Sequence, residues 1–161
     1  MSLYGRDVEL AELAELIDSA RRGNGRALRL TGEAGIGKSA LLAEAVASAK
    51  GMRVLQARAL EAELGLPFAV IKDLVDPLVG YLDEVPPVQR AALSGALALG
   101  PPTPGDRFAA YAGLVSLLAA AAADEPLVLC VDDIQWADRA GAEALLYVSR
   151  RIGNDPIAIL A

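Results

Sequence analysis

The eight residues Gly32–Ser39, Gly-Glu-Ala-Gly-Ile-Gly-Lys-Ser, constrain the fold of this chain more than any other feature. They fit the pattern G-x-x-x-x-G-K-[ST], in which glycines let the backbone approach phosphate oxygens closely. The backbone N–H groups of such a loop point inward, and the helix that follows presents its positive end to the same anion. An apolar segment at Ala27–Thr31 precedes the motif and a predicted helix at Lys38–Lys50 follows it, so the sequence predicts a phosphate-binding loop between a strand and a helix.

Each part of this loop has an expected role in holding a nucleoside triphosphate. We expect Lys38 to reach the β- and γ-phosphates and Ser39 to offer its hydroxyl to Mg²⁺. The other members line the phosphates mainly through their backbone. The expected cofactor-binding residues of the loop and the helix start are Gly32, Glu33, Ala34, Gly35, Ile36, Gly37, Lys38, Ser39 and Ala40. The expected ligands are therefore ATP or ADP together with Mg²⁺.

A second motif lies about ninety residues later, where the apolar run Leu127–Val131 ends in Asp132 and Asp133. A buried strand that ends in acids places carboxylates at the carboxyl edge of a sheet, where ligands bind in open α/β folds. We expect Asp132 to hold Mg²⁺ opposite Ser39, and Asp133 to orient or activate the attacking water. Asp133 and Lys38 are thus the expected catalytic residues.

The segment Ile134–Asp138 follows directly. Trp136 is the only tryptophan, and a core or hinge anchor is favoured for it over direct ligand contact. Asp138 is expected to be the N-cap of the next helix. Gln135 is placed to sense the γ-phosphate.

Strands and helices alternate along the chain, which predicts an α/β fold with a parallel sheet covered by helices on both faces. The expected strands are Ala27–Thr31, Arg53–Ala59, Leu127–Val131 and Ile157–Ala161. The expected helices are Asp7–Arg22 with Asp7 as N-cap, Lys38–Lys50, Pro67–Leu82 with a kink or end at Pro77, Pro86–Leu99, Asp106–Ala123 and Asp138–Ile152, with a loop at Gly100–Gly105. Residues 1–161 then form one nucleotide-binding domain with a helical insertion at 60–125. Because nothing follows the fourth strand, we expect a domain truncated at that point.

Composition excludes several function classes. There is no histidine for catalysis, and the single cysteine, Cys130, lies within an apolar strand as a buried hydrophobe rather than a reactive thiol. The net charge of −6 argues against direct nucleic-acid binding. The longest apolar stretch, Phe108–Ala123, is short and flanked by charges, so we expect a buried helix and no membrane span. The N-terminus lacks a signal pattern, which favours a cytoplasmic location.

Two interpretations stay open for Tyr4–Asp7, just ahead of the first predicted helix. A glycine and a flat or basic residue upstream of the loop, here Gly5 and Arg6, could cover the adenine. Alternatively, the segment is a helix-entry turn with Arg6 in a surface ion pair.

Three runs, GRDVELAEL, GEAGIGKSALL and VLCVDDIQWAD, resemble the nucleotide-binding domain of STAND-class, AAA+-related P-loop ATPases. Together with LPFAVIKDLVDPL, they are similar to the ATPase domains of large LuxR-type, maltose-regulator-like transcriptional regulators. The resemblance implies a P-loop NTPase fold of the ASCE/AAA+-like type and an ATP-dependent signalling switch. It also implies that Gly5 and Arg6 enclose the adenine, and it supports the roles given to Gly32–Ser39, Asp132 and Asp133.

The resemblance also sets limits. The family's sensor residue, winged-helix region and C-terminal regulatory and DNA-binding parts have no counterpart in this sequence. Aspartate at 133, where many P-loop ATPases carry glutamate, implies slow hydrolysis. The implied strand order leaves Ala27–Thr31 without one neighbour, so we expect self-association through that edge.

Three functions are therefore compared. The first is a switch module of a larger regulator. The second is a working enzyme, either an ATPase or a kinase for a small acceptor, although the only candidate lid, Gly100–Arg107, carries one arginine. The third is a scaffold that holds nucleotide without hydrolysing it.

Overall fold

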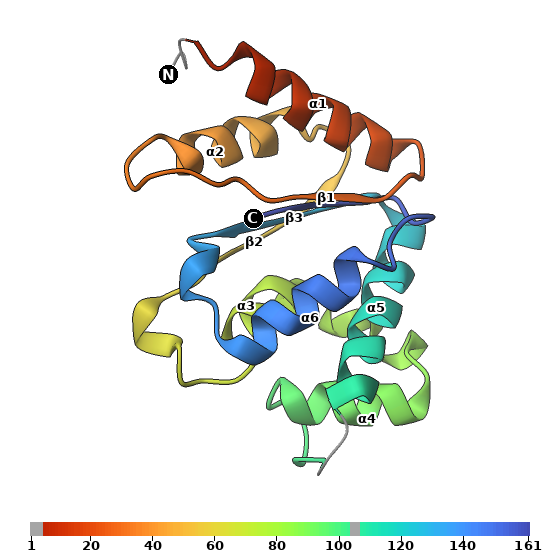
Figure 1. The fold of residues 1–161 in the computed structure, drawn as a ribbon. Helices are drawn as coiled ribbons and strands as arrows, with labels where there is room; N and C mark the ends of the chain where they lie inside the picture. Colours follow the sequence, from red (N-terminus) through yellow and green to blue (C-terminus); the bar gives the residue numbers. More distant parts are fainter. Residues whose placement is uncertain (1–4, 104–106) are drawn as a thin grey trace.

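A four-stranded sheet forms the centre of the chain in the computed structural model, which describes residues 5–103 and 107–161 (Figure 1). All neighbouring strands pair in parallel, in the order β1-β4-β3-β2. The strands are β1 Arg26–Leu28, β2 Arg53–Arg58, β3 Leu127–Asp132 and β4 Ile157–Leu160. The sequence-based prediction of an α/β fold with a parallel sheet is confirmed.

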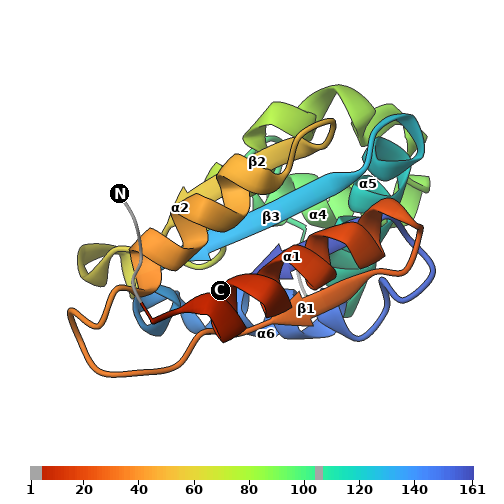
Figure 2. The same ribbon diagram turned by 90° about the horizontal axis from the view of Figure 1, so that it is seen from above.

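Helices cover both faces of this sheet, as Figures 1 and 2 show from the side and from above. The α-helices are α1 Asp7–Arg21, α2 Lys38–Ser48, α3 Ala69–Val75, α4 Pro87–Ala96, α5 Arg107–Asp124 and α6 Arg139–Ser149. The 3₁₀ helices are η1 Glu61–Glu63, η2 Asp76–Glu84 and η3 Ile134–Trp136. Helices α1 and α2 form one layer, and α3, α5 and α6 form the other (Figure 1).

Strand β3 separates two hydrophobic cores, because its side chains alternate between the two faces. Val128 and Cys130 pack with α1 and α2, whereas Leu127, Leu129 and Val131 pack with the opposite layer. Burial raises the pKa of the Cys130 thiol to about 11, with a smaller contribution from the nearby Asp132 carboxylate. This agrees with the expectation of a structural, unreactive cysteine.

The described residues between β2 and β3 form a helical group, η1, α3, η2, α4 and α5. Helices α4 and α5 approach closely at Gly113, where an added Cβ would lie 2.7 Å from the carbonyl oxygen of Gln89. Within the described part of the chain, α5 is the one helix long and apolar enough to cross a membrane. Nine of its 18 residues are buried in the protein core.

Several predicted boundaries are corrected by the structure. Strand β1 ends at Leu28 rather than Thr31, although hydrogen bonds with Ala161 hold the extended backbone as far as Leu30. Arg6, not Asp7, is the N-cap of α1, and no side chain caps this helix. The other helix and strand limits agree with the prediction to within three residues, as the bounds above show.

The helix predicted over Pro67–Leu82 begins later, at Ala69 with Phe68 as N-cap at φ 63°, and the end predicted at Pro77 is confirmed, because α3 stops at Val75. The chain continues as η2, and Pro77 lies in its first turn, where its missing N–H breaks no hydrogen bond. Tyr4, together with residues 104–106 of the expected loop and helix start, lies outside the described residues.

Candidate functional site

The glycine-rich loop joins β1 to α2, as the strand–loop–helix pattern predicts. Gly35 and Gly37 have φ angles of 78° and 98°, a backbone region that side-chain-bearing residues rarely adopt. Gly37 is the N-cap of α2, so the helix begins directly at Lys38. The positive end of α2 therefore faces the inside of the loop.

Lys38 lies across this loop. Its Nζ donates hydrogen bonds to the carbonyl oxygens of Gly32 and Glu33, both at 2.9 Å. Lys38 also lines a cavity of about 730 Å³, a size that suits a small-molecule site. The residues around the cavity come from the loop, its flanks and the segment after β3: Arg29, Leu30, Thr31, Gly32, Ala34, Gly35, Gly37, Lys38, Ser39, Asp133, Ile134, Gln135 and Trp136.

Ser39 and Asp132 meet beside this cavity, although 93 residues separate them in the sequence. The Ser39 hydroxyl donates a hydrogen bond of 3.0 Å to Asp132 Oδ1. A hydroxyl and a carboxylate are hard oxygen ligands of the kind that Mg²⁺ prefers. Within residues 5–103 and 107–161, no three His, Cys, Asp or Glu side chains gather as a metal site. The two oxygens fit an ion that takes its remaining ligands from phosphates and water, as Mg²⁺ does in phosphate sites.

Asp133 follows at φ 53°, in a left-handed conformation that turns the chain into η3. Its carboxylate accepts hydrogen bonds from Arg58 Nε at 2.8 Å and from Gln135 Nε2 at 3.1 Å. The Arg58 guanidinium, and secondarily the Gln135 amide, hold the pKa of the Asp133 carboxyl below its usual value. Asp133 is therefore ionised at neutral pH, with each oxygen accepting a hydrogen bond from the protein.

Arg58 is a site residue that sequence reasoning did not find. It ends β2 and stands in register with Asp132 on β3. A charged residue at the end of the strand next to the acidic strand end is a signal that could have indicated it. The register could not be read from the sequence without knowing that β2 neighbours β3.

Arg6 connects the start of α1 with the phosphate-binding loop. Its NH1 donates to Glu9 at 2.6 Å, and its NH2 donates to the carbonyl oxygen of Ile36 at 2.9 Å. The surface ion pair, one of the two interpretations of this segment from the sequence, is therefore formed with Glu9. Arg6 also contacts the phosphate-binding loop. Gly5, at φ 70°, lies immediately before it. Ala40 lies in the first turn of α2, two residues beyond Lys38.

Asp138 is the N-cap of α6, as predicted. Its Oδ1 accepts hydrogen bonds from the backbone N–H groups of Gly141 at 2.8 Å and Phe68 at 2.9 Å. The side chain is only 4% exposed, so these bonds tie the segment after β3 to the start of α3. The bond to Phe68 was not expected, because the two residues are 70 positions apart.

Of the two roles favoured for Trp136, a core or a hinge anchor, the structure contradicts the core position. Trp136 is 36% exposed and lines the cavity of the phosphate-binding loop instead of packing in either core. Gln135 lines the same cavity, beside Asp133.

A model of the family described as AAA ATPase domain matches residues 2–160, which is nearly the whole chain. No curated protein and no solved structure matches the chain.

Proposed function

Because the chain belongs to the AAA ATPase domain family, we propose that it is the ATP-binding, slowly hydrolysing switch module of a signal-responsive transcriptional regulator. The observation that carries the nucleotide assignment is the Ser39–Asp132 hydrogen bond at the mouth of the phosphate-binding loop. The regulator context, STAND-class and LuxR-type, rests on the resemblance of the runs around Gly32–Ser39 and Asp132–Asp138. We propose a cytoplasmic location on the same ground.

In this proposal, different residues of the chain serve nucleotide binding and hydrolysis. Lys38 and the loop N–H groups hold the phosphates, and Ser39 and Asp132 hold the Mg²⁺. Such an ion neutralises the charge that develops on the phosphates. Asp133 orients the attacking water. Arg6 links the loop to α1, next to the place proposed for the adenine at Gly5 and Arg6.

Slow hydrolysis is supported by the contacts of Asp133. Both of its oxygens already accept hydrogen bonds, from Arg58 and from Gln135. A water molecule must compete with these donors for the carboxylate. A domain of this kind holds ATP long enough to favour one conformation, which is what a switch requires.

Thermal unfolding with and without Mg-ATP tests the binding function. At a ligand concentration 100 times the Kd, binding stabilises the fold by about 2.7 kcal/mol. Lys38→Ala should lose most of this stabilisation and keep the melting temperature of the unliganded protein. Lys50→Ala, at an exposed lysine just beyond the other end of α2, is the matched control and should keep the stabilisation by Mg-ATP. An equal shift of the melting temperature in Lys38→Ala and the wild type would refute the assignment of this loop as the nucleotide site.

Phosphate release then separates the three functions that the sequence allowed. A switch binds ATP and hydrolyses it slowly, a working ATPase turns it over steadily, and a scaffold shows binding with no release. Phosphoryl transfer to a small acceptor in place of water would identify a kinase. Parallel titrations with ADP and GTP establish which nucleotide the site prefers.

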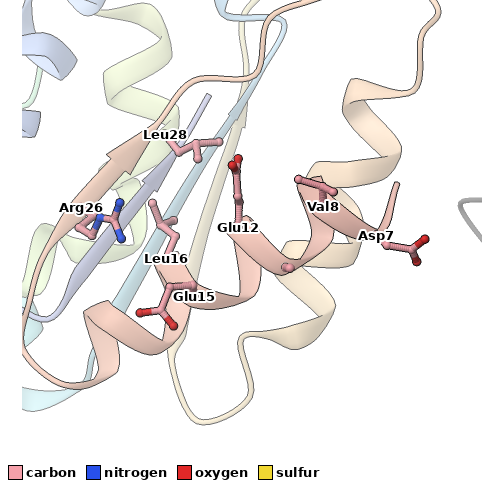
Figure 3. A pocket seen from close by; sticks show the side chains of 8 residues that line it. Asp7, Val8, Glu12, Glu15, Leu16, Arg26 and Leu28 are labelled. Atoms are coloured by element: carbon pink, nitrogen blue, oxygen red, sulfur yellow. The ribbon is translucent and has the colours of Figure 1, made fainter. Parts of the chain in front are cut away.

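Self-association through the edge of β1 is a second part of the proposal. Among the described strands, β1 pairs only with β4. Its other edge borders a cavity of about 720 Å³ against α1, shown in Figure 3. Val8, 71% exposed, and Leu28 supply apolar surface to this groove, while Glu12 and Arg26 supply charge. An unpaired edge of this kind can pair with another chain.

Sedimentation velocity at increasing protein concentration tests the association. We expect the sedimentation coefficient to rise with concentration and expect Leu28→Lys, which puts a charge beside the edge, to suppress the rise. A monomer at every protein concentration would refute self-association.

We also propose that this chain does not bind nucleic acid directly, on the basis of its charge of −6. Sequence-dependent retardation of DNA at physiological salt would contradict that.

A further inference from the structure

We infer that Trp136 contacts the terminal phosphate of the bound nucleotide and so distinguishes a triphosphate from a diphosphate. The inference rests on the proposed nucleotide-binding function and assigns a specificity-determining residue to that same site. Trp136 is the only tryptophan in the chain, so the tryptophan fluorescence of the protein reports on this position alone.

The position of η3 relative to the metal-binding oxygens identifies the end of the cavity at which Trp136 lies. The Ser39–Asp132 hydrogen bond marks the place where these two residues would hold the ion that neutralises phosphate charge. Asp133 comes next in the chain, and η3 begins immediately after it. Trp136 lines the same cavity as Lys38 and Ser39. The indole therefore belongs to the terminal-phosphate end of the site.

The indole has a free donor to offer there. Trp136 is 36% exposed, and within the described part of the chain its Nε1–H makes no hydrogen bond to another residue. Indole can only donate, so a ligand that bonds to it must present an acceptor. The cavity is also lined by Lys38 and the glycine-rich loop, whose N–H groups suit phosphate oxygens, and by the Asp133 carboxylate. A phosphate oxygen supplies the acceptor that this indole lacks.

The turn that carries the ring is held at both ends. The Trp136 N–H donates to the Asp133 carbonyl oxygen at 2.8 Å, and the Ala137 N–H donates to that of Ile134 at 3.0 Å. Beyond the turn, the buried Asp138 fixes the start of α6. Because the backbone of this turn is already fixed, little conformational entropy is lost when a ligand binds. The free energy of a contact made by the ring is therefore not cancelled by the entropy cost of ordering the turn.

Two measurements test the inference. The first is the tryptophan emission of the wild-type chain, titrated with Mg²⁺ and either a non-hydrolysable ATP analogue or ADP. We expect a clear change in intensity or wavelength with the triphosphate and a smaller one with the diphosphate. The second is calorimetric affinity for both nucleotides in Trp136→Phe, which keeps an aromatic ring and lacks the N–H donor.

A hydrogen bond to a charged group contributes enough for Trp136→Phe to weaken triphosphate binding by about tenfold, while ADP binding stays within about twofold of wild type. Phe108→Ala, at a 64% exposed aromatic residue on α5, is the control and should change neither affinity. If thermal shifts prove that nucleotide binds, two results would still overturn the inference. One is a ratio of triphosphate to diphosphate affinity in Trp136→Phe equal to that of the wild type. The other is tryptophan emission of the wild type that does not change when the triphosphate is added. Absence of any thermal shift by nucleotide in the wild type would instead refute the proposed function, and the inference with it.

Discussion

Asp138→Ala should destabilise the protein far more than the loss of one surface carboxylate. The side chain is 4% exposed and accepts two backbone hydrogen bonds through a single oxygen, one as the cap of α6 and one from Phe68. Loss of an N-cap costs about 1 kcal/mol. A buried N–H left without an acceptor costs about 1–3 kcal/mol more. Phe68 would keep its left-handed backbone, at φ 63°, without the bond that holds it.

One feature of Asp138 reduces this loss. Its Oδ2 is buried and has no partner in the part of the chain that the structure describes, so alanine also removes a carboxylate oxygen that burial disfavours. We therefore expect a net loss of about 2–3 kcal/mol in the free energy of unfolding. Urea denaturation measures it as a lower midpoint with an unchanged m-value.

Two further variants make the measurement specific. Asp138→Asn keeps the accepting oxygen, and asparagine caps helices as well as aspartate does, so most of the stability should return. Asp83→Ala removes an aspartate that is 96% exposed and should leave the urea midpoint unchanged. A loss below about 1 kcal/mol in Asp138→Ala would show that Phe68 and α6 do not depend on this carboxylate.

Three shorter predictions follow from other contacts. Burial raises the pKa of Cys130 from 9.0 to about 11, so the unfolded state releases this proton first as pH rises. The wild type should therefore lose about 2 kcal/mol of stability between pH 9 and 11 that Cys130→Ala keeps, as urea denaturation at both pH values would show. Arg58 lowers the pKa of Asp133, so Arg58→Gln should move the carboxyl titration of Asp133 to higher pH, measured by carbon-13 NMR; an unchanged midpoint would contradict the ion pair. A Cβ on Gly25 would lie 1.9 Å from a backbone carbonyl oxygen, so Gly25→Ala should destabilise by about 1–3 kcal/mol, whereas Gly80→Ala, with open space around it, should leave the melting temperature unchanged.

The parallel sheet and the phosphate-binding loop were predictable because local patterns determine them. The motif at Gly32–Ser39 specifies its own backbone, and apolar runs such as Leu127–Val131 predict buried strands. The Asp138 cap was predictable for the same reason, since an aspartate just before an amphipathic helix is a local signal.

Contacts between distant segments were not predictable in this way. The bond from Asp138 to Phe68 and the pairing of Arg58 with Asp133 depend on which strands and turns become neighbours. The core position considered for Trp136 was wrong because a tryptophan is usually highly buried, whereas Trp136 lies in η3 and lines the cavity. Pro77 indicated that the helix in Pro67–Leu82 ends there, but the apolar pattern did not show that the chain continues as a 3₁₀ helix from Asp76.

The pairing of β1 with β4 constrains when the nucleotide site can form during synthesis. Ala27 is in register with Ile159, so the strand that carries the phosphate-binding loop gains its partner only after more than 120 further residues have been made. Strands β2 and β3 can pair before that. As the ribosome extends the chain, the helical layer of α3, α4 and α5 has time to assemble on these two strands. The loop at Gly32–Ser39 follows β1 directly, so we expect the phosphate-binding site to form only after β4 has been made and has paired with β1.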